Sequence, residues 1–182
     1  MKVFSEITQQ LAEWALAQPV YFIATSPLAE EGHINVSPRG LQHLRILDLQ
    51  HVVLLDLTGS GNESAAHIQE NKRITIMFCA FEGAPRILRF YGEAQVILPN
   101  QTNWHEMRSH FDKDIAGVRQ IFSIQVNRVQ TSCGFGVPLM NFVAQRNELT
   151  HWAEKKDDKS LAEYQKKNNR VSIDGLQAPF VK

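Results

Sequence analysis

The chain has 182 residues, of which 43% are hydrophobic and 21% charged, and 19 Lys and Arg balance 19 Asp and Glu. Because no excess of cations is present, a protein that binds nucleic acid mainly through phosphate contacts is not expected. No apolar run approaches the length of a membrane span, and the start lacks the apolar core of a secretory signal. With only two cysteines, a disulfide framework is not expected either. We therefore expect a cytoplasmic globular protein with a single domain over residues 1–182.

The first half of the chain predicts one helix and then a series of strands. Residues 5–17 place apolar side chains on one helical face, and Ser5 is the expected N-cap. Runs rich in β-forming residues follow and predict strands at 20–27, 34–40 and 45–58. The last of these runs has room for one or two strands. After the turn GSGN, a short helix is expected over residues 63–71.

The second half continues with longer strands. A buried strand is expected at 73–81, followed by a long one at 86–98 in which Gly92 predicts a bulge. Next comes a helix over 103–111, where Asn103 and Glu106 have the spacing of a capping box. Residues 119–134 alternate between polar and apolar side chains, which predicts a strand with one wet and one dry face.

The chain ends in a polar helix over about 147–168 and a terminal arm that packs back on the barrel. Short helices lie in the connections, and strands and helices do not alternate regularly. This order favours an antiparallel β-barrel over a doubly wound parallel sheet. The expected fold class is therefore mainly β, with a barrel core over about residues 18–135 and a C-terminal helix and arm over 147–182.

The stretch TGSGNES, residues 58–64, joins a buried strand to a helix. Exposed N–H groups at a helix start favour an anion, and Thr58, Ser60 and Asn62 would add donors. Plain capping of the helix by Ser60 or Asn62 explains the same residues. From spacing alone, capping is the simpler interpretation, because GSGN does not match a strict phosphate-loop pattern.

Two arginines are further candidates for an anion site. Arg39 and Arg89 lie in or beside strands expected to line one end of the barrel, and a guanidinium suits phosphate or the charge of a reduced ring. For either residue alone, a surface arginine with its head in water is the simpler interpretation. The seven histidines form no recognisable ligand set, so no metal site is expected.

Four stretches in order resemble the pyridoxamine 5′-phosphate oxidase-like family of FMN-binding split barrels. They are VYFIATSP, INVSPRG, VVLLDLTGSGNESAAHIQENKRITIMFCAF and RILRFYGEAQVIL. The tail SIDGL also resembles the end of an uncharacterised branch of that family. The resemblance implies a six-stranded antiparallel split β-barrel with peripheral α-helices, paired as a homodimer with FMN in the groove between the subunits.

The resemblance also implies a cofactor site. Val36, Ser37 and Pro38 would run beside the isoalloxazine ring, and Arg39 falls where the family usually has a basic residue. The ribityl phosphate would lie at Thr58, Gly59, Ser60, Gly61 and Asn62.

One position departs from the pattern of the family. The pyridoxamine phosphate oxidases themselves carry an Arg-Lys pair for the phosphate where this chain has Glu63 and Ser64. A carboxylate close to a phosphate is repulsive by roughly 1 kcal/mol or more. Either Glu63 points away, or Arg39 and backbone N–H groups compensate, or FMN is not bound.

The leading hypothesis is an FMN-dependent oxidoreductase that acts on an unidentified small molecule. Its catalytic residues cannot be assigned, although Arg39 or Arg89 near N1 of the flavin would stabilise the reduced anion. The alternative is a non-catalytic split barrel that carries flavin or haem, because the chain shows no clear set of acid, base and nucleophile. A third hypothesis is an interaction protein with an empty groove, for which Glu63 is the best argument.

Overall fold

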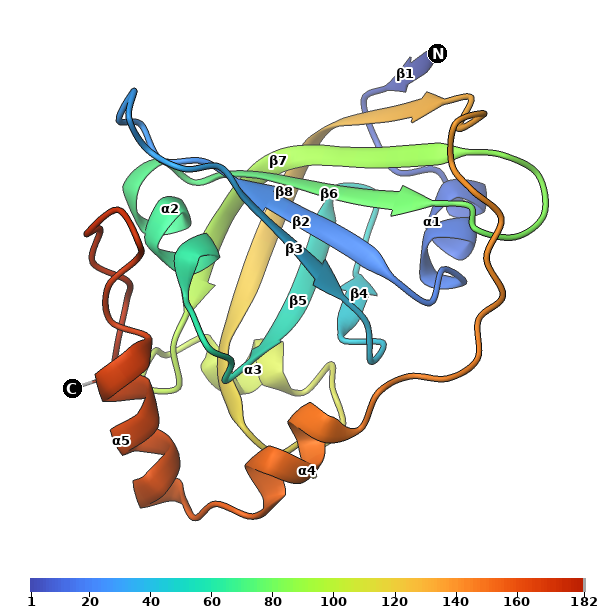
Figure 1. Cartoon of the computed structure of the whole chain (residues 1–182). Helices are drawn as coiled ribbons and strands as arrows, with labels where there is room; N and C mark the ends of the chain where they lie inside the picture. Colours follow the sequence, from blue (N-terminus) through green and yellow to red (C-terminus); the bar gives the residue numbers. More distant parts are fainter. Residues whose placement is uncertain (182) are drawn as a thin grey trace.

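The computed structural model describes residues 1–181, and its centre is one antiparallel eight-stranded sheet with five helices around it (Figure 1). The strands are β1 Lys2–Phe4, β2 Tyr21–Thr25, β3 Asn35–Arg39, β4 Leu44–Ile46, β5 His51–Leu57, β6 Arg73–Cys79, β7 Ile87–Ile97 and β8 Val118–Ser132. The helices are α1 Gln9–Leu16, α2 Glu63–Asn71, α3 Trp104–Arg108, α4 Glu148–Glu154 and α5 Asp158–Asn168. The mainly β prediction is confirmed. The expected strands are present, the run 45–58 divides into the two strands β4 and β5, and the three-residue strand β1 is additional.

The sheet curls into a split barrel. Its strand order is β3-β2-β6-β7-β8-β5-β4, and β1 pairs with the far half of β8. Arg39 at the end of β3 nevertheless reaches Asp56 on β5, with Nη2 donating to Oδ1 at 3.0 Å. Two side chains therefore join the edge strand to the opposite end of the sheet, where no strand pairing does so within residues 1–181.

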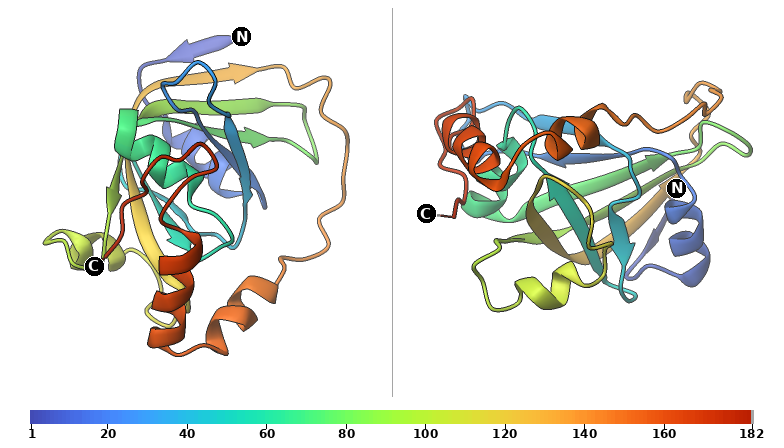
Figure 2. Two further views of the ribbon diagram at one scale, coloured as in Figure 1. Left: turned by 60° about the vertical axis from the view of Figure 1, so that its left-hand side comes forward. Right: turned by 90° about the horizontal axis from the view of Figure 1, so that it is seen from below.

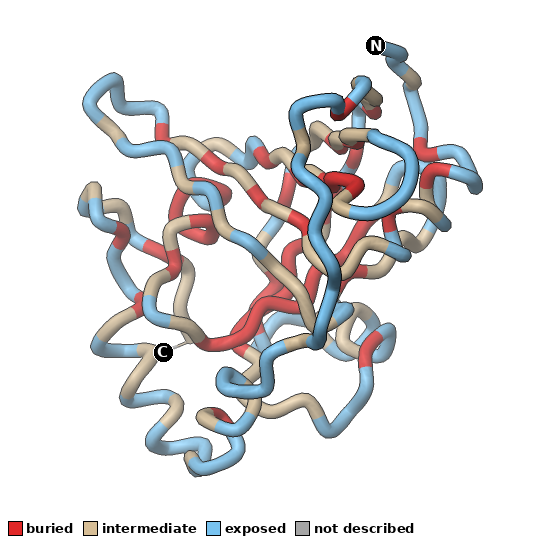
Figure 3. The backbone as a smooth tube through the Cα atoms, turned by 45° about the vertical axis from the view of Figure 1, so that its right-hand side comes forward, coloured by how far each residue is buried: buried red, intermediate tan, exposed pale blue. Residues whose placement is uncertain are grey.

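The inside of the barrel is filled with apolar side chains. The central strands alternate so that Ile23, Ile76 and Phe90 meet there, all buried. Helix α1 adds Leu11 and helix α2 adds Ile68 to the same cluster. A second cluster lies on the other face of β5 and β8 beneath α3, so β5 is buried on both faces (Figure 3).

The bulge predicted at Gly92 is confirmed. The pairing of β7 with β8 shifts register between Tyr91 and Gly92. A Cβ atom at position 92 would overlap the carbonyl oxygen of Gln125 on the neighbouring strand. Glycine is therefore required where the two backbones approach each other.

The N-cap predicted at Ser5 is wrong, and Asn103 is the N-cap of α3 without the predicted capping hydrogen bond. Helix α1 begins at Gln9, and its N-cap is Thr8, whose hydroxyl accepts a hydrogen bond from the N–H of Leu11 at 3.3 Å. Ser5 lies instead next to β1, a strand whose three residues depend on pairing with β8. Asn103 precedes α3, but its side chain makes no capping hydrogen bond. Its backbone has φ −85° and ψ 0°, not the extended conformation typical of an N-cap.

The single helix expected over 147–168 is also wrong, because the chain breaks there into α4 and α5. Asp157 adopts an extended conformation and caps α5 by accepting a hydrogen bond from the N–H of Ser160 at 2.8 Å. The terminal arm then folds into a small hairpin with a bridge between Val171 and Gln177, and it lies beside α2 (Figure 2). None of the helices in residues 1–181 has the length and apolar character needed to cross a membrane.

The predicted alternation of an exposed polar face and a buried apolar face holds only in the second half of β8. Gln125 and Asn127 are exposed there, whereas Ile124 and Val126 are buried. In the first half, Arg119 and Gln120 are buried together with Ile121. The alternation fails because these polar side chains take part in an internal cluster with Asp56, which forms part of the candidate site.

Candidate functional site

A cavity of about 300 Å³ lies where β3, β5 and β8 meet the turn between β5 and α2. Strand β3 contributes Ser37 and Arg39 to its wall, and the turn contributes residues 59–64. Asp56 and Arg119 form the remaining charged part. The structure therefore brings together six of the residues predicted from the sequence: Ser37, Arg39, Gly59, Ser60, Gly61 and Asn62.

A buried ion cluster forms one side of this cavity. Asp56 is 1% exposed, and its Oδ2 atom accepts hydrogen bonds from Arg119 Nη2 at 2.7 Å and from Gln120 Nε2 at 2.8 Å. Arg39 reaches Oδ1, as described above. Burial opposes ionisation of Asp56, but Arg119 and Arg39 outweigh it and hold the pKa of this carboxyl below its usual value. The ionised cluster of two cations and one carboxylate therefore carries a formal charge of +1.

Two of the predicted donors, Thr58 and Asn62, are already used by the chain itself. The hydroxyl of Thr58 donates to a backbone carbonyl at 2.9 Å and accepts a hydrogen bond from Gln165 Nε2 at 2.8 Å. The side chain of Asn62 donates to the carbonyl of Asn169 at 3.1 Å and accepts from Gln120 at 2.7 Å. These two residues therefore shape the turn and are not free to bind a ligand.

The backbone of the turn is fixed through its carbonyl groups. Arg119 Nη1 donates to the carbonyl of Gly61 at 2.9 Å, and Asn169 Nδ2 donates to that of Gly59 at 3.0 Å. Asn62 is the N-cap of α2, yet its side chain makes no capping hydrogen bond. The first N–H groups of α2 thus lack their usual partner, and the positive end of the helix dipole favours an anion there.

Glu63 and Ser64 both line the cavity. The Oε2 atom of Glu63 accepts a hydrogen bond from the N–H of Ile173 in the terminal arm, at 3.0 Å. Ser64 Oγ accepts one from Asn35 Nδ2 at 2.9 Å. Arg39, one of the two arginines that line the cavity, has a buried Nε atom with no hydrogen-bond partner within residues 1–181. Glu63 therefore lines the cavity while one of its carboxylate oxygens is bound to the terminal arm.

Val36 and Pro38 lie on the face of β3 opposite to the cavity. The strand alternates, so Ser37 and Arg39 are half-buried while Val36 and Pro38 are exposed. The structure therefore separates the predicted residues of β3 into two groups on two faces.

Arg89 belongs to the outer group. It lies on β7, donates to Ser132 Oγ at 3.2 Å and does not line the cavity. The pairings Pro38–Phe22, Phe22–Met77 and Met77–Arg89 form one continuous row across four strands. This outer row is a mostly apolar surface with one cation at its end.

Sequence reasoning missed Asp56, Arg119 and Gln120. A signal for Asp56 was present, because a lone carboxylate in the apolar run HVVLLDL must be paired when the strand is buried. Its partners on β8 could not be identified without the pairing of β5 with β8. Gln165 and Asn169 were also missed, because nothing in a polar helix indicates which amide faces a turn about 107–110 residues away.

Comparison with known proteins agrees with this architecture. Residues 7–133 match the family described as "Pyridoxamine 5′-phosphate oxidase". The pyridoxamine 5′-phosphate oxidase family protein ustO of Aspergillus flavus is 36% identical over 193 residues, which cover 97% of this chain and 77% of that protein.

Solved structures share the fold at lower identity. HupZ of Group A Streptococcus has a TM-score of 0.57 and 20% identity, covering 70% of this chain and 94% of its own. An FMN-binding protein of Syntrophomonas wolfei has a TM-score of 0.50 and 12% identity, covering 73% and 90%. The family match over well over half of the chain, together with the relative at 36% identity, shows that the chain belongs to the pyridoxamine 5′-phosphate oxidase family.

Proposed function

We propose that this protein binds FMN and acts as a flavin-dependent oxidoreductase on a small molecule. The observation that carries the proposal is the cavity at the start of α2, where a helix N-terminus without a side-chain cap lies beside Arg39 and the Asp56–Arg119 pair. An anion is favoured by a helix start and by a guanidinium. The tail of FMN ends in such an anion.

The residues present fit the tail of a flavin. The side chain of Arg39 lines the cavity and is 32% exposed, Ser60 also lines the cavity, and the first N–H groups of α2 have no side-chain cap. A volume of about 300 Å³ is at the lower end of ligand pockets, which span roughly 300 to 1,000 Å³. The cavity would therefore enclose the phosphate and ribityl chain, and the ring would extend beyond it.

The bound flavin would supply hydride transfer at N5, while the protein binds and orients it. In this arrangement Asp56 holds the guanidinium of Arg39 in place through the 3.0 Å contact. Arg119 also pairs with Asp56 and neutralises its charge, so the positive charge of Arg39 is left for the ligand. We assign no acid, base or nucleophile to the reaction.

We further propose a homodimer that closes the flavin groove, in the cytoplasm. In support, Val36 and Ile34 beside the outer row are 59% and 72% exposed. The segment after β8 adds Phe135, Leu139 and Val143, all more than three quarters exposed. Exposed apolar side chains mark interaction surfaces where they gather into one patch. The free cysteines Cys79 and Cys133 are consistent with a reducing compartment.

The test is to purify the protein, record its visible spectrum and titrate FMN. We expect a yellow protein or micromolar binding, and about tenfold weaker binding for Arg39→Gln, equal to roughly 1.4 kcal/mol. Arg146→Gln is the matched control, because this arginine is exposed and pairs with exposed Glu148. A colourless protein without micromolar affinity for FMN would refute the proposal.

A second candidate function is a carrier of flavin or haem without turnover. It is favoured by the lining of the cavity, whose two titratable carboxylates, Asp56 and Glu63, are both tied to other parts of the chain. Reduction of the holo-protein by NADPH or NADH, followed by reoxidation with an acceptor, separates the two functions. A holo-protein that is never reduced supports the carrier.

A further inference from the structure

We infer that Glu63, fixed at the rim of the cavity by the C-terminal arm, selects ligands by the charge of their phosphate. It disfavours the phosphate monoester of FMN relative to the pyrophosphate of FAD, in which each phosphate carries one charge, or to a flavin without phosphate. The inference rests on the proposed flavin site. It concerns which flavin tail that site accepts.

Glu63 competes with the ligand for one position. It is the first residue of α2, so its carboxylate lies at the positive end of the helix dipole. The same helix end, with the same lack of a side-chain cap, is where the phosphate of a ligand would be received. A negative side chain and a negative ligand therefore share the N-terminus of α2.

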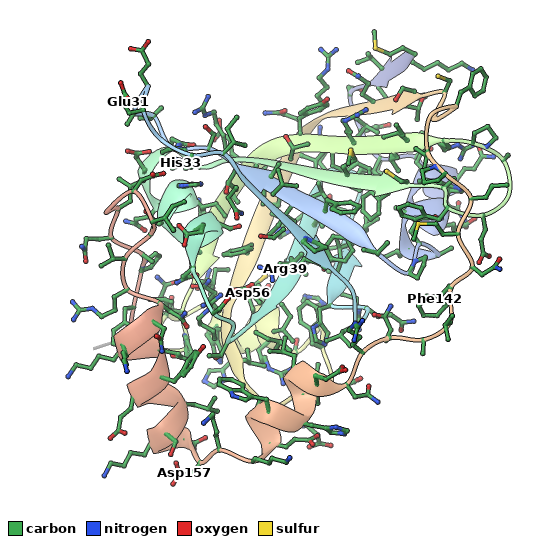
Figure 4. All side chains as sticks on the ribbon, in the orientation of Figure 1. Glu31, His33, Arg39, Asp56, Phe142 and Asp157 are labelled. Atoms are coloured by element: carbon green, nitrogen blue, oxygen red, sulfur yellow. The ribbon has the colours of Figure 1, made fainter. Side chains whose placement is uncertain are left out.

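The terminal arm keeps the Glu63 carboxylate in this position. Ile173 N–H donates to Glu63 Oε2 at 3.0 Å, so the carboxylate loses a hydrogen bond if it turns to solvent. The next residue, Asp174, accepts a hydrogen bond from the N–H of His33 at 2.8 Å and contacts His33 Nδ1 at 2.6 Å. The arm is thus attached both to α2 and to the β2–β3 loop, where Figure 4 shows His33. Within the arm, Ser172 Oγ accepts from the N–H groups of Asp174 and Leu176.

The charges around the cavity sum to zero once Glu63 is included. Arg39 and Arg119 provide two cations, and Asp56 and Glu63 provide two carboxylates. A phosphate monoester carries about −1.5 to −2 charges at neutral pH on one phosphorus, whereas the pyrophosphate of FAD spreads two charges over two phosphates, one on each. Repulsion falls with distance, so Glu63 acts most strongly on the FMN monoester, whose whole charge lies at the start of α2, and less on FAD, whose second phosphate lies farther away.

The experiment is a set of titrations with riboflavin, FMN and FAD at one salt concentration. Glu63→Gln removes the charge but keeps an oxygen that can accept from Ile173. We expect this variant to bind FMN about tenfold more tightly than the wild type, equal to roughly 1.4 kcal/mol. Its affinity for FAD should rise less, by about threefold, and its affinity for riboflavin should stay within about twofold.

Glu82→Gln is the matched control. The carboxylate of Glu82 also accepts one backbone N–H, from Phe142 at 3.0 Å, but it does not line the cavity. It changes the net charge of the protein by the same amount and should leave all three affinities unchanged. Circular dichroism establishes that each variant is folded. Glu63→Ala must give the same order of affinity changes for FMN, FAD and riboflavin as Glu63→Gln.

The outcomes distinguish failure of the proposed role of Glu63 from failure of flavin binding itself. Equal changes for the three flavins, or no change, would overturn the role of Glu63 while flavin binding itself stands. If neither the wild type nor Glu63→Gln binds any of the flavins, the proposed function fails and the inference fails with it.

Discussion

Arg39 on β3 and Asp56 on β5 contact each other at 3.0 Å across the opening of the split barrel, as Figure 4 shows near its centre. The contact has two consequences, because Asp56 is also paired with Arg119 at 2.7 Å. It joins the two ends of the sheet, and it fixes the cation that faces the proposed ligand. The stability of the barrel and the charge of the site therefore depend on the same carboxylate.

Replacing Asp56 with alanine should destabilise the fold strongly. The change leaves Arg119, which is 7% exposed, without its carboxylate partner. Loss of one partner of a buried ion pair typically costs about 3–5 kcal/mol. Urea denaturation measures the free energy of unfolding directly. Arg146→Ala is the control, because its pair with Glu148 is exposed and should change stability by less than about 1 kcal/mol.

The same carboxylate predicts how stability depends on pH. The folded-state pKa of Asp56 is lowered, so its contribution is fully present above the unfolded-state pKa of about 3.9 and is lost as pH falls through the folded-state value. We expect the free energy of unfolding to fall in this acid range in the wild type and to fall less steeply in Asp56→Asn. Urea titrations at a series of pH values from 6 to 3 measure both slopes. Identical slopes would contradict the assignment.

Most of the fold could be predicted from the sequence because its signals are local. Strand runs, turn residues and the glycine bulge depend on near neighbours, and all six expected strands are found. What could not be predicted depends on contacts distant in sequence. Strand β1 exists only by pairing with β8, and the cap at Thr8 follows from where that strand ends. The break at Asp157 had a local signal, an acidic residue with Ser160 three positions later, which the charge run obscured.

The candidate site was predictable in position but not in composition. Helix-start chemistry singled out the stretch 58–64, and Arg39 was a candidate from its place in a strand and from the resemblance. Arg119 and Asn169 were missed because pairing of β5 with β8 and the return of α5 bring them to the turn. Val36 and Ser37 cannot face one cavity together, since neighbours in a strand point to opposite faces. That separation is visible only once the cavity is located.

Gly92 should not tolerate a side chain. Gly92→Ala would place a methyl group against the carbonyl of Gln125 at the bulge, and forced overpacking typically costs about 1–3 kcal/mol. Gly136→Ala is the control, because nothing lies within 4 Å of its Cβ position. Thermal unfolding followed by circular dichroism should show a lower midpoint for Gly92→Ala alone. Equal midpoints would mean that the backbone at the bulge is able to separate.

Val36 offers a test of the proposed homodimer. A charged side chain within a buried apolar interface is strongly unfavourable, so Val36→Asp should shift the protein from dimer to monomer in sedimentation velocity experiments. Leu28→Asp is the matched control, because Leu28 is a similarly exposed apolar residue in the β2–β3 loop. A wild type that sediments as a monomer would refute the homodimer, and a Val36→Asp variant that stays dimeric would place the interface elsewhere.

Asn169 tests whether helix α5 positions the ligand-binding turn. Its side chain donates to the carbonyl of Gly59 at 3.0 Å and its own carbonyl accepts from Asn62. Asn169→Ala removes the hydrogen bond to Gly59 and leaves helix α5 intact, so the free energy of unfolding should fall by about 1 kcal/mol. FMN affinity should fall about tenfold, because the turn loses the contact that fixes its backbone.

Asn168→Ala is the control for this change. Within the described residues 1–181, the side chain of Asn168 bonds only to the carbonyl of Tyr164 in the same helix, at 2.9 Å. The two neighbouring substitutions remove the same chemical group and one hydrogen bond each. Fluorescence titration with FMN should therefore separate them even where urea denaturation does not. Equal losses of affinity would show that α5 supports the fold in general, and that the turn binds its ligand without help from Asn169.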